Sequence, residues 1–180
     1  MTAEATATNV GDPAPGLELP DTEGRVHTLP MPGEASATVV VWTCNHCPYA
    51  LAWHDRLVQV ARDYAPRGVR FLAVNSNDAE RYPRDSLGAM RERVDSEDWH
   101  FPYLHDESQQ AARAWAAQVT PHVYVLDGDR RVRYEGAPDA DHMDPERNAD
   151  WLRDALDDLL SGRQPRRAET EPVGCSIKWK

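Results

Sequence analysis

The sequence lacks any apolar segment long enough to span a bilayer, and its opening stretch, MTAEATATNVGDPAPG, has neither a basic start nor the apolar run of a secretory signal. Basic residues are outnumbered as well: 20 Lys and Arg against 30 Asp and Glu give a formal net charge of -10. With no basic face to offset the acid, phosphate backbones and anionic lipid surfaces are poor partners. The sequence therefore argues against nucleic-acid and membrane binding, and it favours a cytoplasmic location.

Cysteine is also scarce, with only Cys44, Cys47 and Cys175 in 180 residues. Three cysteines are too few, and odd in number, for a disulfide scaffold. In a reducing compartment a closely spaced pair is more often catalytic or metal-binding than structural. The length suits one domain with tails. We expect a disordered leader over residues 1–9, a folded domain over 10–162, and a C-terminal tail over 163–180 that carries Cys175.

Apolar periodicity and turn residues predict an alternating order of elements. A small hairpin is expected within 11–30, turning at 21–24, and β-branched density predicts buried strands at 37–43 and 69–76. The remaining elements are helices at 45–64, 81–97, 107–118 and 144–162, and two strands within 122–136 joined at 127–129. Strand and helix alternation followed by a late hairpin predicts an α/β fold with a central mixed sheet flanked by helices.

The pair lies in VVVWTCNHCPYALAW, where an apolar strand runs into a helix. Cys44 falls at the start of that helix, where free backbone N–H groups and the helix dipole favour an anion, so we expect a lowered thiol pKa. Protonated His46 would add a second stabilising charge. Helical phase places Cys47 beside the apolar stripe and therefore in a more sheltered position. These positions predict that Cys44 attacks a disulfide and that Cys47 resolves the mixed disulfide.

CNHC entering a helix after an apolar strand resembles the C-x-x-C site of the thioredoxin superfamily, and His46 stands where its more oxidising members carry a histidine. GDPAPGLELPDTEGRVHTL resembles the N-terminal hairpin of the peroxiredoxin-like and membrane-tethered redoxin branches. The segments VNSND, YPRDS, FPYLHDESQQ and VGCSIKWK resemble a peroxiredoxin-like subgroup of redoxins whose members carry CNHCP. The resemblance runs from about Gly11 to Lys180. It implies a thioredoxin-like fold with an N-terminal β-hairpin extension.

The same resemblance implies a cis proline facing the cysteines, and Thr120-Pro121 is the matching position. Such a protein needs no prosthetic group, because the electrons reside on the two sulfurs. The implied activity is thiol–disulfide exchange on a protein or small-molecule disulfide, with a thioredoxin-type protein as reductant. The substrate, the reduction potential and the oligomeric state are left open.

A thiol peroxidase is the first alternative. In peroxiredoxins the peroxide-attacking cysteine is commonly followed by proline and preceded by a threonine a few residues earlier, and Cys47-Pro48 with Thr43 partly fits that pattern. Those enzymes also carry an arginine that polarises the peroxide, and in this sequence that position holds Pro121. An antioxidant activity of this kind would use Cys47 as the attacking thiol.

A metal-binding or non-catalytic interaction role is the second alternative. Cys44, Cys47, Cys175 and one histidine offer a zinc ligand set, and copper(I) could use the first two cysteines alone. A lone C-x-x-C is only half of a structural zinc signature, so our main prediction contains no metal.

Two further residues have more than one interpretation. Cys175 is either a third redox thiol that folds back to the pair or a tail thiol with a packing role, and Ile177 and Trp179 beside it indicate docking onto the domain. Trp42 either shelters the site or belongs to the core, as an aromatic residue at the end of a central strand often does.

Overall fold

The computed structural model describes residues 8–29 and 35–180. The leader expected over residues 1–9 therefore lies outside the described residues, apart from Thr8 and Asn9. Thr8 is buried, and its hydroxyl donates a hydrogen bond to the Ala114 carbonyl oxygen at 3.4 Å. Contacts with the folded body therefore begin no later than residue 8.

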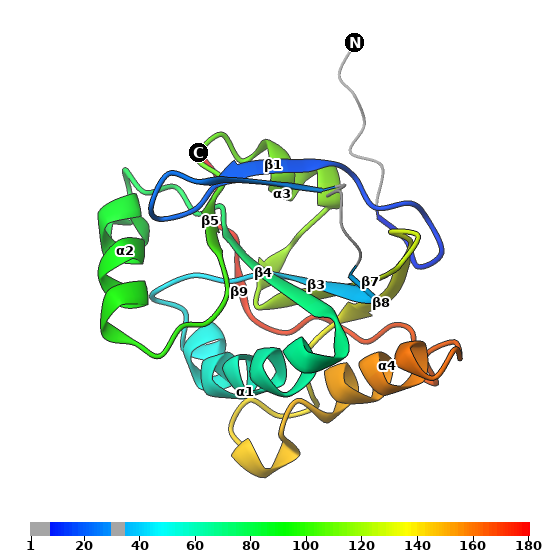
Figure 1. Cartoon of the computed structure of the whole chain (residues 1–180). Helices are drawn as coiled ribbons and strands as arrows, with labels where there is room; N and C mark the ends of the chain where they lie inside the picture. Colours follow the sequence, from blue (N-terminus) through cyan, green and yellow to red (C-terminus); the bar gives the residue numbers. More distant parts are fainter. Residues whose placement is uncertain (1–7, 30–34) are drawn as a thin grey trace.

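A mixed five-stranded sheet forms the centre of the molecule, as the sequence predicts (Figure 1). Its strand order is β5-β4-β3-β7-β8, with β3 parallel to β4, β4 parallel to β5, and the other pairs antiparallel. The strands are β3 (Ala37–Trp42), β4 (Val69–Asn75), β5 (Tyr103–His105), β7 (His122–Asp127) and β8 (Val132–Gly136). Every residue of β3 is buried, as expected for a β-branched central strand covered on both faces.

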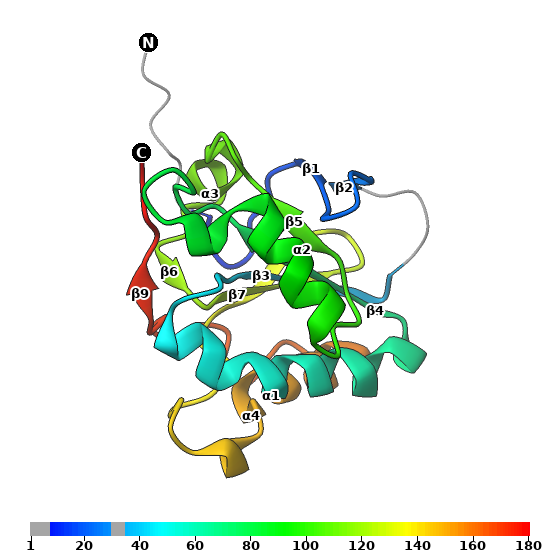
Figure 2. The same ribbon diagram turned by 90° about the vertical axis from the view of Figure 1, so that its left-hand side faces the viewer.

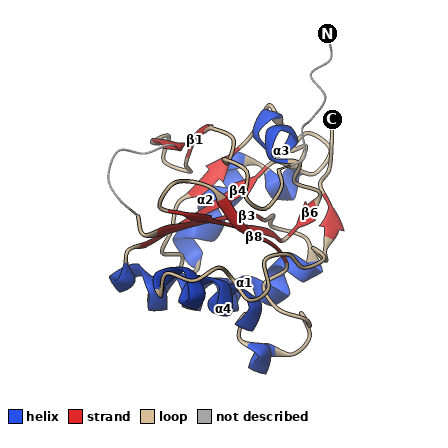
Figure 3. Cartoon of the chain, turned by 90° about the vertical axis from the view of Figure 1, so that its right-hand side faces the viewer, coloured by secondary structure: helices blue, strands red, loops and turns tan. Residues whose placement is uncertain are grey.

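Helices and a hairpin cover the two faces of this sheet. Figure 3 shows α1 (Pro48–Tyr64) and α4 (Asp150–Leu160) on one face and α3 (Gln110–Trp115) on the other. The predicted N-terminal hairpin, β1 (Leu17–Pro20) with β2 (Val26–Leu29), lies on the α3 side, and α2 (Leu87–Ser96) lies towards the β5 edge (Figure 1). Among the described residues no helix is long and apolar enough to cross a membrane.

The structure corrects several element boundaries. The helix expected from residue 45 begins at Pro48, because the fixed φ and missing N–H of proline suit the first helical position, and this makes Cys47 the N-cap. The helix expected over 107–118 is the shorter α3, which ends where Ala116 adopts a φ of 55°. The helix expected over 144–162 divides into a 3₁₀ turn at Pro145–Arg147 and α4. Strand β5 was not predicted.

The C-terminal tail returns to the body as a strand. Strand β9 (Cys175–Ser176) pairs antiparallel with β6 (Val119–Thr120), and the register places Cys175 opposite Thr120. A Cβ on Gly174 would stand 2.0 Å from the Thr120 carbonyl oxygen, so only glycine allows this close approach. Buried Ile177 donates its N–H to the Gln118 carbonyl oxygen at 3.1 Å. Figure 2 shows β9 beside β6 at the end of the molecule where α1 begins.

Candidate active site

The two cysteines of the C-x-x-C pair follow the carboxyl end of β3, and both are buried. Cys44 is 1% exposed and Cys47 is 0% exposed. With Ala50 they form a small apolar cluster, against which Tyr49 and Cys175 pack. The expectation that Cys44 presents an exposed sulfur is therefore wrong, because β6 and the returning tail cover the start of α1.

Thr120 contacts both cysteines from the opposite side of the site. Its Oγ1 lies 3.3 Å from Cys44 Sγ, and its carbonyl oxygen lies 3.3 Å from Cys47 Sγ. The Thr120–Pro121 peptide bond is cis, as the resemblance implies. One residue of β6 thus holds both sulfurs of the pair in place.

Cys47 is the thiol that carries the negative charge most readily. The Cys44 S–H group donates to the Cys47 sulfur and, despite desolvation by burial, lowers the Cys47 pKa to about 4. The Cys175 thiol, the Ala50 backbone N–H and Thr120 contribute smaller parts of this lowering. Because Cys47 is the N-cap of α1, it lies at the positive end of the helix dipole. A thiolate is the nucleophilic form of cysteine, so Cys47 is the activated member of the pair.

The pKa of Cys44 shifts in the opposite direction. The thiolate of Cys47 and burial both raise the Cys44 pKa, and the buried carboxylate of Asp85 raises it further. The Thr120 hydroxyl and the His46 backbone N–H oppose this rise without reversing it. The lowered pKa expected for Cys44 is therefore wrong: the helix starts three residues later than predicted, so its N-terminal field acts on Cys47.

Cys175 joins the pair as a third thiol. It packs against the Cys44 and Cys47 cluster, and its S–H group donates to the Cys47 sulfur. Burial, followed by this interaction with Cys47, raises the Cys175 pKa to about 11. Cys175 is only partly buried, unlike the other two cysteines. The tail therefore folds back to the pair, a position that both interpretations given above allow.

The His46 side chain is paired with Asp85 and does not direct an unpaired charge at the thiols. Its Nδ1 lies against the Asp85 carboxylate, and its ring stacks on Tyr82 with 5.5 Å between centroids. The charge of a protonated His46 would therefore be balanced by Asp85 and would not be available to stabilise a thiolate at Cys44. The stabilising role expected for this side chain is not supported, and its backbone N–H acts on Cys44 instead.

Asp85 is a buried acid next to the site that the sequence reasoning missed. It is fully buried and accepts hydrogen bonds from the Asn45 backbone N–H at 2.7 Å and from the side-chain amides of Asn75 and Asn77, each at 3.0 Å. Its position in the YPRDS segment, one of the family-like motifs, was the available signal. Asn75, the last residue of β4, and Asn77 just beyond it therefore hold this carboxylate.

Arg93 was also missed. Its guanidinium is buried, and Nη1 donates to the Cys44 carbonyl oxygen at 3.0 Å and to Asn45 Oδ1 at 3.2 Å. An arginine therefore does approach the cysteines, but it bonds to the backbone of Cys44. No periodic pattern marks such a residue, because its role depends on how α2 packs against the loop.

The other predicted site residues support the backbone around the pair. Trp42 is fully buried, and its Nε1–H donates to Ser76 Oγ at 3.0 Å, which agrees with a core role. Thr43 is buried and donates its backbone N–H to the Val74 carbonyl oxygen at 2.9 Å. Pro48 occupies the first position of α1.

One set of potential metal ligands was found among the described residues. The ligand atoms of Cys44, His46 and Asp85 all lie within 4.8 Å of one another. This set differs from the three cysteines and one histidine considered above. Three N–H donors already bond to the Asp85 carboxylate and Cys44 resists ionisation, so the set is poorly suited to a cation.

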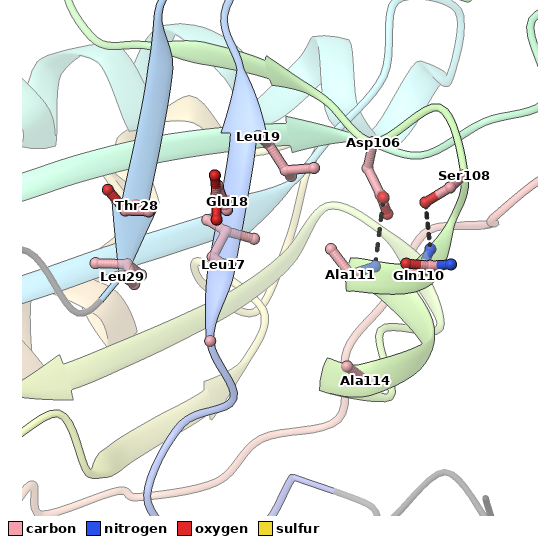
Figure 4. Close-up of a pocket in the computed structure, with 11 residues that line it drawn as sticks. Leu17, Glu18, Leu19, Thr28, Leu29, Asp106, Ser108, Gln110, Ala111 and Ala114 are labelled. Atoms are coloured by element: carbon pink, nitrogen blue, oxygen red, sulfur yellow. Dashed lines mark hydrogen bonds between the residues drawn. The ribbon is translucent and has the colours of Figure 1, made fainter.

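A groove of about 580 Å³ lies on the other face of the sheet, between the β1–β2 hairpin and α3 (Figure 4). Its lining combines apolar residues such as Leu17 and Ala114 with the polar side chains of Glu18, Asp106 and Ser108. Asp106 accepts a hydrogen bond from the Ala111 N–H within it at 3.3 Å. None of its lining residues belongs to the cysteine cluster, so the groove and the thiols are separate features.

Comparison with known proteins identifies thiol-based families. A model of the AhpC/TSA family matches residues 10–135. The curated 1-Cys peroxiredoxin PER1 of Zea mays is 21% identical, and the match covers 93% of this chain and 82% of that protein. An uncharacterized conserved protein from Geobacillus kaustophilus has a solved structure with 39% identity and a TM-score of 0.89, covering 99% of this chain and 96% of that one.

Two further solved structures are similar to this chain. A hypothetical protein from Sinorhizobium meliloti 1021 shows 32% identity and a TM-score of 0.90, and the match covers 97% of both chains. A putative thiol:disulfide interchange protein DsbE from Chlorobium tepidum is 22% identical with a TM-score of 0.60, covering 72% of this chain and 85% of that one. The DsbE likeness shows the shared thioredoxin-like fold.

Proposed function

Since this chain belongs to the AhpC/TSA family and has a thioredoxin-like fold, we propose that it is a thiol–disulfide oxidoreductase that uses a Cys44–Cys47 dithiol/disulfide couple. The observation that carries this proposal is the placement of the pair: both sulfurs belong to one buried cluster, and Thr120 lies 3.3 Å from each of them. Two thiols in contact, only one of which ionises readily, suit the two successive steps of exchange.

The proposed exchange uses the two thiols in a fixed order. The Cys47 thiolate attacks the sulfur of a disulfide that has reached the buried pair, which forms a mixed disulfide and releases the first thiolate. Cys44 then loses its proton and attacks the Cys47 sulfur, which forms the Cys44–Cys47 disulfide and releases the second substrate thiol. The substrate gains two electrons and the pair loses two. An external dithiol, such as a thioredoxin-type protein in a reducing cytoplasm, restores the pair.

This order reverses the roles that helical phase predicted for the two cysteines. The reversal follows from Cys47 being the N-cap of α1 and from the Asp85 charge beside Cys44. Pro121 and Thr120 keep the roles that the resemblance implies, which are to shape the site opposite the pair. The couple requires no metal or prosthetic group, because the sulfurs themselves carry the electrons.

The proposal predicts that the purified protein catalyses the reduction of insulin by dithiothreitol well above the uncatalysed rate. A Cys44→Ser/Cys47→Ser double variant is the matched control, because serine keeps the size and polarity of each thiol while removing its redox chemistry. Turbidity of the released insulin B chain measures the rate. If the wild-type protein does not exceed the double variant, the proposed function is wrong.

A thiol peroxidase is the second candidate, since Cys47 combines a lowered pKa with a following proline and the curated relative is a 1-Cys peroxiredoxin. The nearby Arg93 guanidinium bonds to the Cys44 carbonyl oxygen, and Pro121 occupies the position of the polarising arginine. We therefore expect hydrogen peroxide to oxidise Cys47 more slowly than a disulfide does. A peroxide rate that exceeds the insulin rate would favour the peroxidase.

Metal content tests the remaining alternative. Elemental analysis of protein purified without chelators is expected to give much less than one zinc or copper per chain. Stoichiometric metal that is lost from a Cys44→Ser variant would replace both redox proposals with a metal-binding role.

A further inference from the structure

The two sulfurs of the pair have almost no contact with solvent. Cys44 is 1% exposed and Cys47 is 0% exposed, so an external disulfide cannot approach either sulfur in this conformation. Thiol–disulfide exchange requires direct contact between the attacking sulfur and the disulfide it attacks. The buried pair therefore needs either an opening movement or an intermediate thiol.

Cys175 has the position of such an intermediate. It is the partly exposed member of the three cysteines, and it packs against the cluster that holds Cys44 and Cys47. It stands opposite Thr120 in the β6–β9 pair, and Thr120 itself contacts both buried sulfurs. The three thiols therefore form a continuous series from Cys44 through Cys47 to Cys175 at the surface.

The tail that carries Cys175 is held to the body on both sides of this residue. Gly174 packs directly on the Thr120 carbonyl group, and Ile177 is 2% exposed. Beyond them, the Lys178 N–H donates to Asn77 Oδ1 and the Asp78 N–H donates to the Lys178 carbonyl oxygen, each at 2.8 Å. Exchange through Cys175 leaves these contacts in place, whereas release of the tail would break all of them.

Building on the function proposed above, we propose that Cys175 is the entry thiol of a three-cysteine relay, through which external disulfides exchange with the buried Cys44–Cys47 pair. In the first step Cys175 passes its proton to the Cys47 thiolate and attacks the external disulfide R–S–S–R′, which forms a Cys175 mixed disulfide and releases R′–S⁻. That leaving thiolate then takes the proton from Cys47. The contact of Cys175 with the cluster of the pair provides the path for the first transfer.

Two internal exchanges complete the relay. The Cys47 thiolate attacks the Cys175 sulfur, which forms a Cys47–Cys175 disulfide and releases R–S⁻. Cys44 then gives up its proton to this thiolate and attacks Cys47, which forms the Cys44–Cys47 disulfide and returns Cys175 as a thiolate that is reprotonated from water. The external disulfide has gained two electrons, and Cys44 and Cys47 have supplied them. The reverse sequence lets an external dithiol reduce the pair.

The charged groups near Cys175 and Cys47 favour an attack that begins at Cys175. Cys175 is protonated at neutral pH because its pKa is about 11, so it depends on the neighbouring Cys47 thiolate as a base. The Lys178 ammonium group lowers the Cys175 pKa in part and so favours the thiolate that forms during attack. A thiol of high pKa is a strong nucleophile once it is ionised.

A Cys175→Ser variant tests the relay, with Ser176→Ala as the matched control on the exposed face of the same strand. With the pair intact but its entry thiol removed, turnover of insulin by dithiothreitol should fall at least about tenfold. Ser176→Ala should keep the wild-type rate. Oxidation with diamide and measurement of the melting temperature would show that the Cys175→Ser pair still forms its disulfide in a folded protein.

A trapping experiment tests the same relay without turnover. Reduced Cys44→Ser protein, treated with one equivalent of oxidised glutathione, should accumulate the Cys47–Cys175 disulfide, which peptide mapping under non-reducing conditions identifies. Glutathione found on Cys47 with Cys175 free would overturn the relay. A Cys175→Ser variant as active as wild type would also overturn it while leaving the proposed function intact, whereas an inactive wild-type protein would contradict the proposed function itself.

Discussion

Cys47→Ser is expected to lower insulin reduction at pH 7 by at least about a hundredfold, because it removes the central member of a catalytic unit. The variant keeps Cys44, whose pKa is raised by burial and by the Asp85 carboxylate and which is therefore protonated at this pH. It also lacks the sulfur with which Cys44 would form its disulfide. Initial rates of insulin precipitation, measured beside the wild-type protein, check this expectation.

The companion variant Cys44→Ser distinguishes the role of Cys44 from that of Cys47. It prevents the Cys44–Cys47 disulfide and so lowers turnover to the exchange that Cys47 and Cys175 support together, and the serine hydroxyl can still donate to the Cys47 sulfur. One thiolate per chain should therefore persist in Cys44→Ser and be absent from Cys47→Ser. If Cys47→Ser retained more than about a tenth of the wild-type rate, exchange would not depend on Cys47, and its place as the central thiol would be wrong.

Asp139→Ala is expected to lower the free energy of unfolding by about 3–5 kcal/mol, the cost of removing one partner of a buried ion pair. Asp139 accepts hydrogen bonds from Arg56 Nη1 at 2.9 Å, from Trp53 Nε1 at 2.8 Å and from the Ala149 N–H at 2.9 Å. These contacts join α1 to the segment that precedes α4. The substitution leaves the Arg56 charge buried with only backbone carbonyl partners, such as that of His142.

Urea unfolding of the reduced protein measures this loss. Asp95→Ala, at an exposed position on α2, is the matched control and should change the free energy of unfolding by less than about 0.5 kcal/mol. A loss below about 1 kcal/mol for Asp139→Ala would mean that the Arg56–Asp139 pair does not anchor α1.

The main elements of the fold could be predicted because their signals are local. The β-branched runs of β3 and β4 and the amphipathic pattern of α4 are visible in the sequence. Strands β6 and β9 contain two residues each, which is too short for an alternating pattern of apolar and polar residues to be recognised. Their pairing arises only when the tail packs across the body, and residue order alone does not reveal such a contact.

The residues of the site were easier to predict than their roles. The sequence identifies all three cysteines and the Thr120–Pro121 position. It favours Cys44 as the activated thiol because the helix was expected from residue 45, whereas the observed start at Pro48 favours Cys47. Pro48 was the available signal, since proline favours the first helical position and so marks Cys47 as the N-cap. The burial of Cys44 had no local signal, because the covering groups come from β6 and from the C-terminal tail.

The central claim is that Cys47 carries the thiolate of a buried, proton-sharing pair, and the thiolate absorbance near 240 nm tests it most directly. Titration of the reduced wild-type protein should show one thiolate per chain whose pKa lies near 4, well below the ordinary value of about 8.5. Above this pKa the thiolate is present, and it is lost as the pH falls through it. The low-pH transition should persist in Cys44→Ser and disappear in Cys47→Ser. A wild-type transition near pH 8.5, or one that disappears in Cys44→Ser instead, would contradict the account.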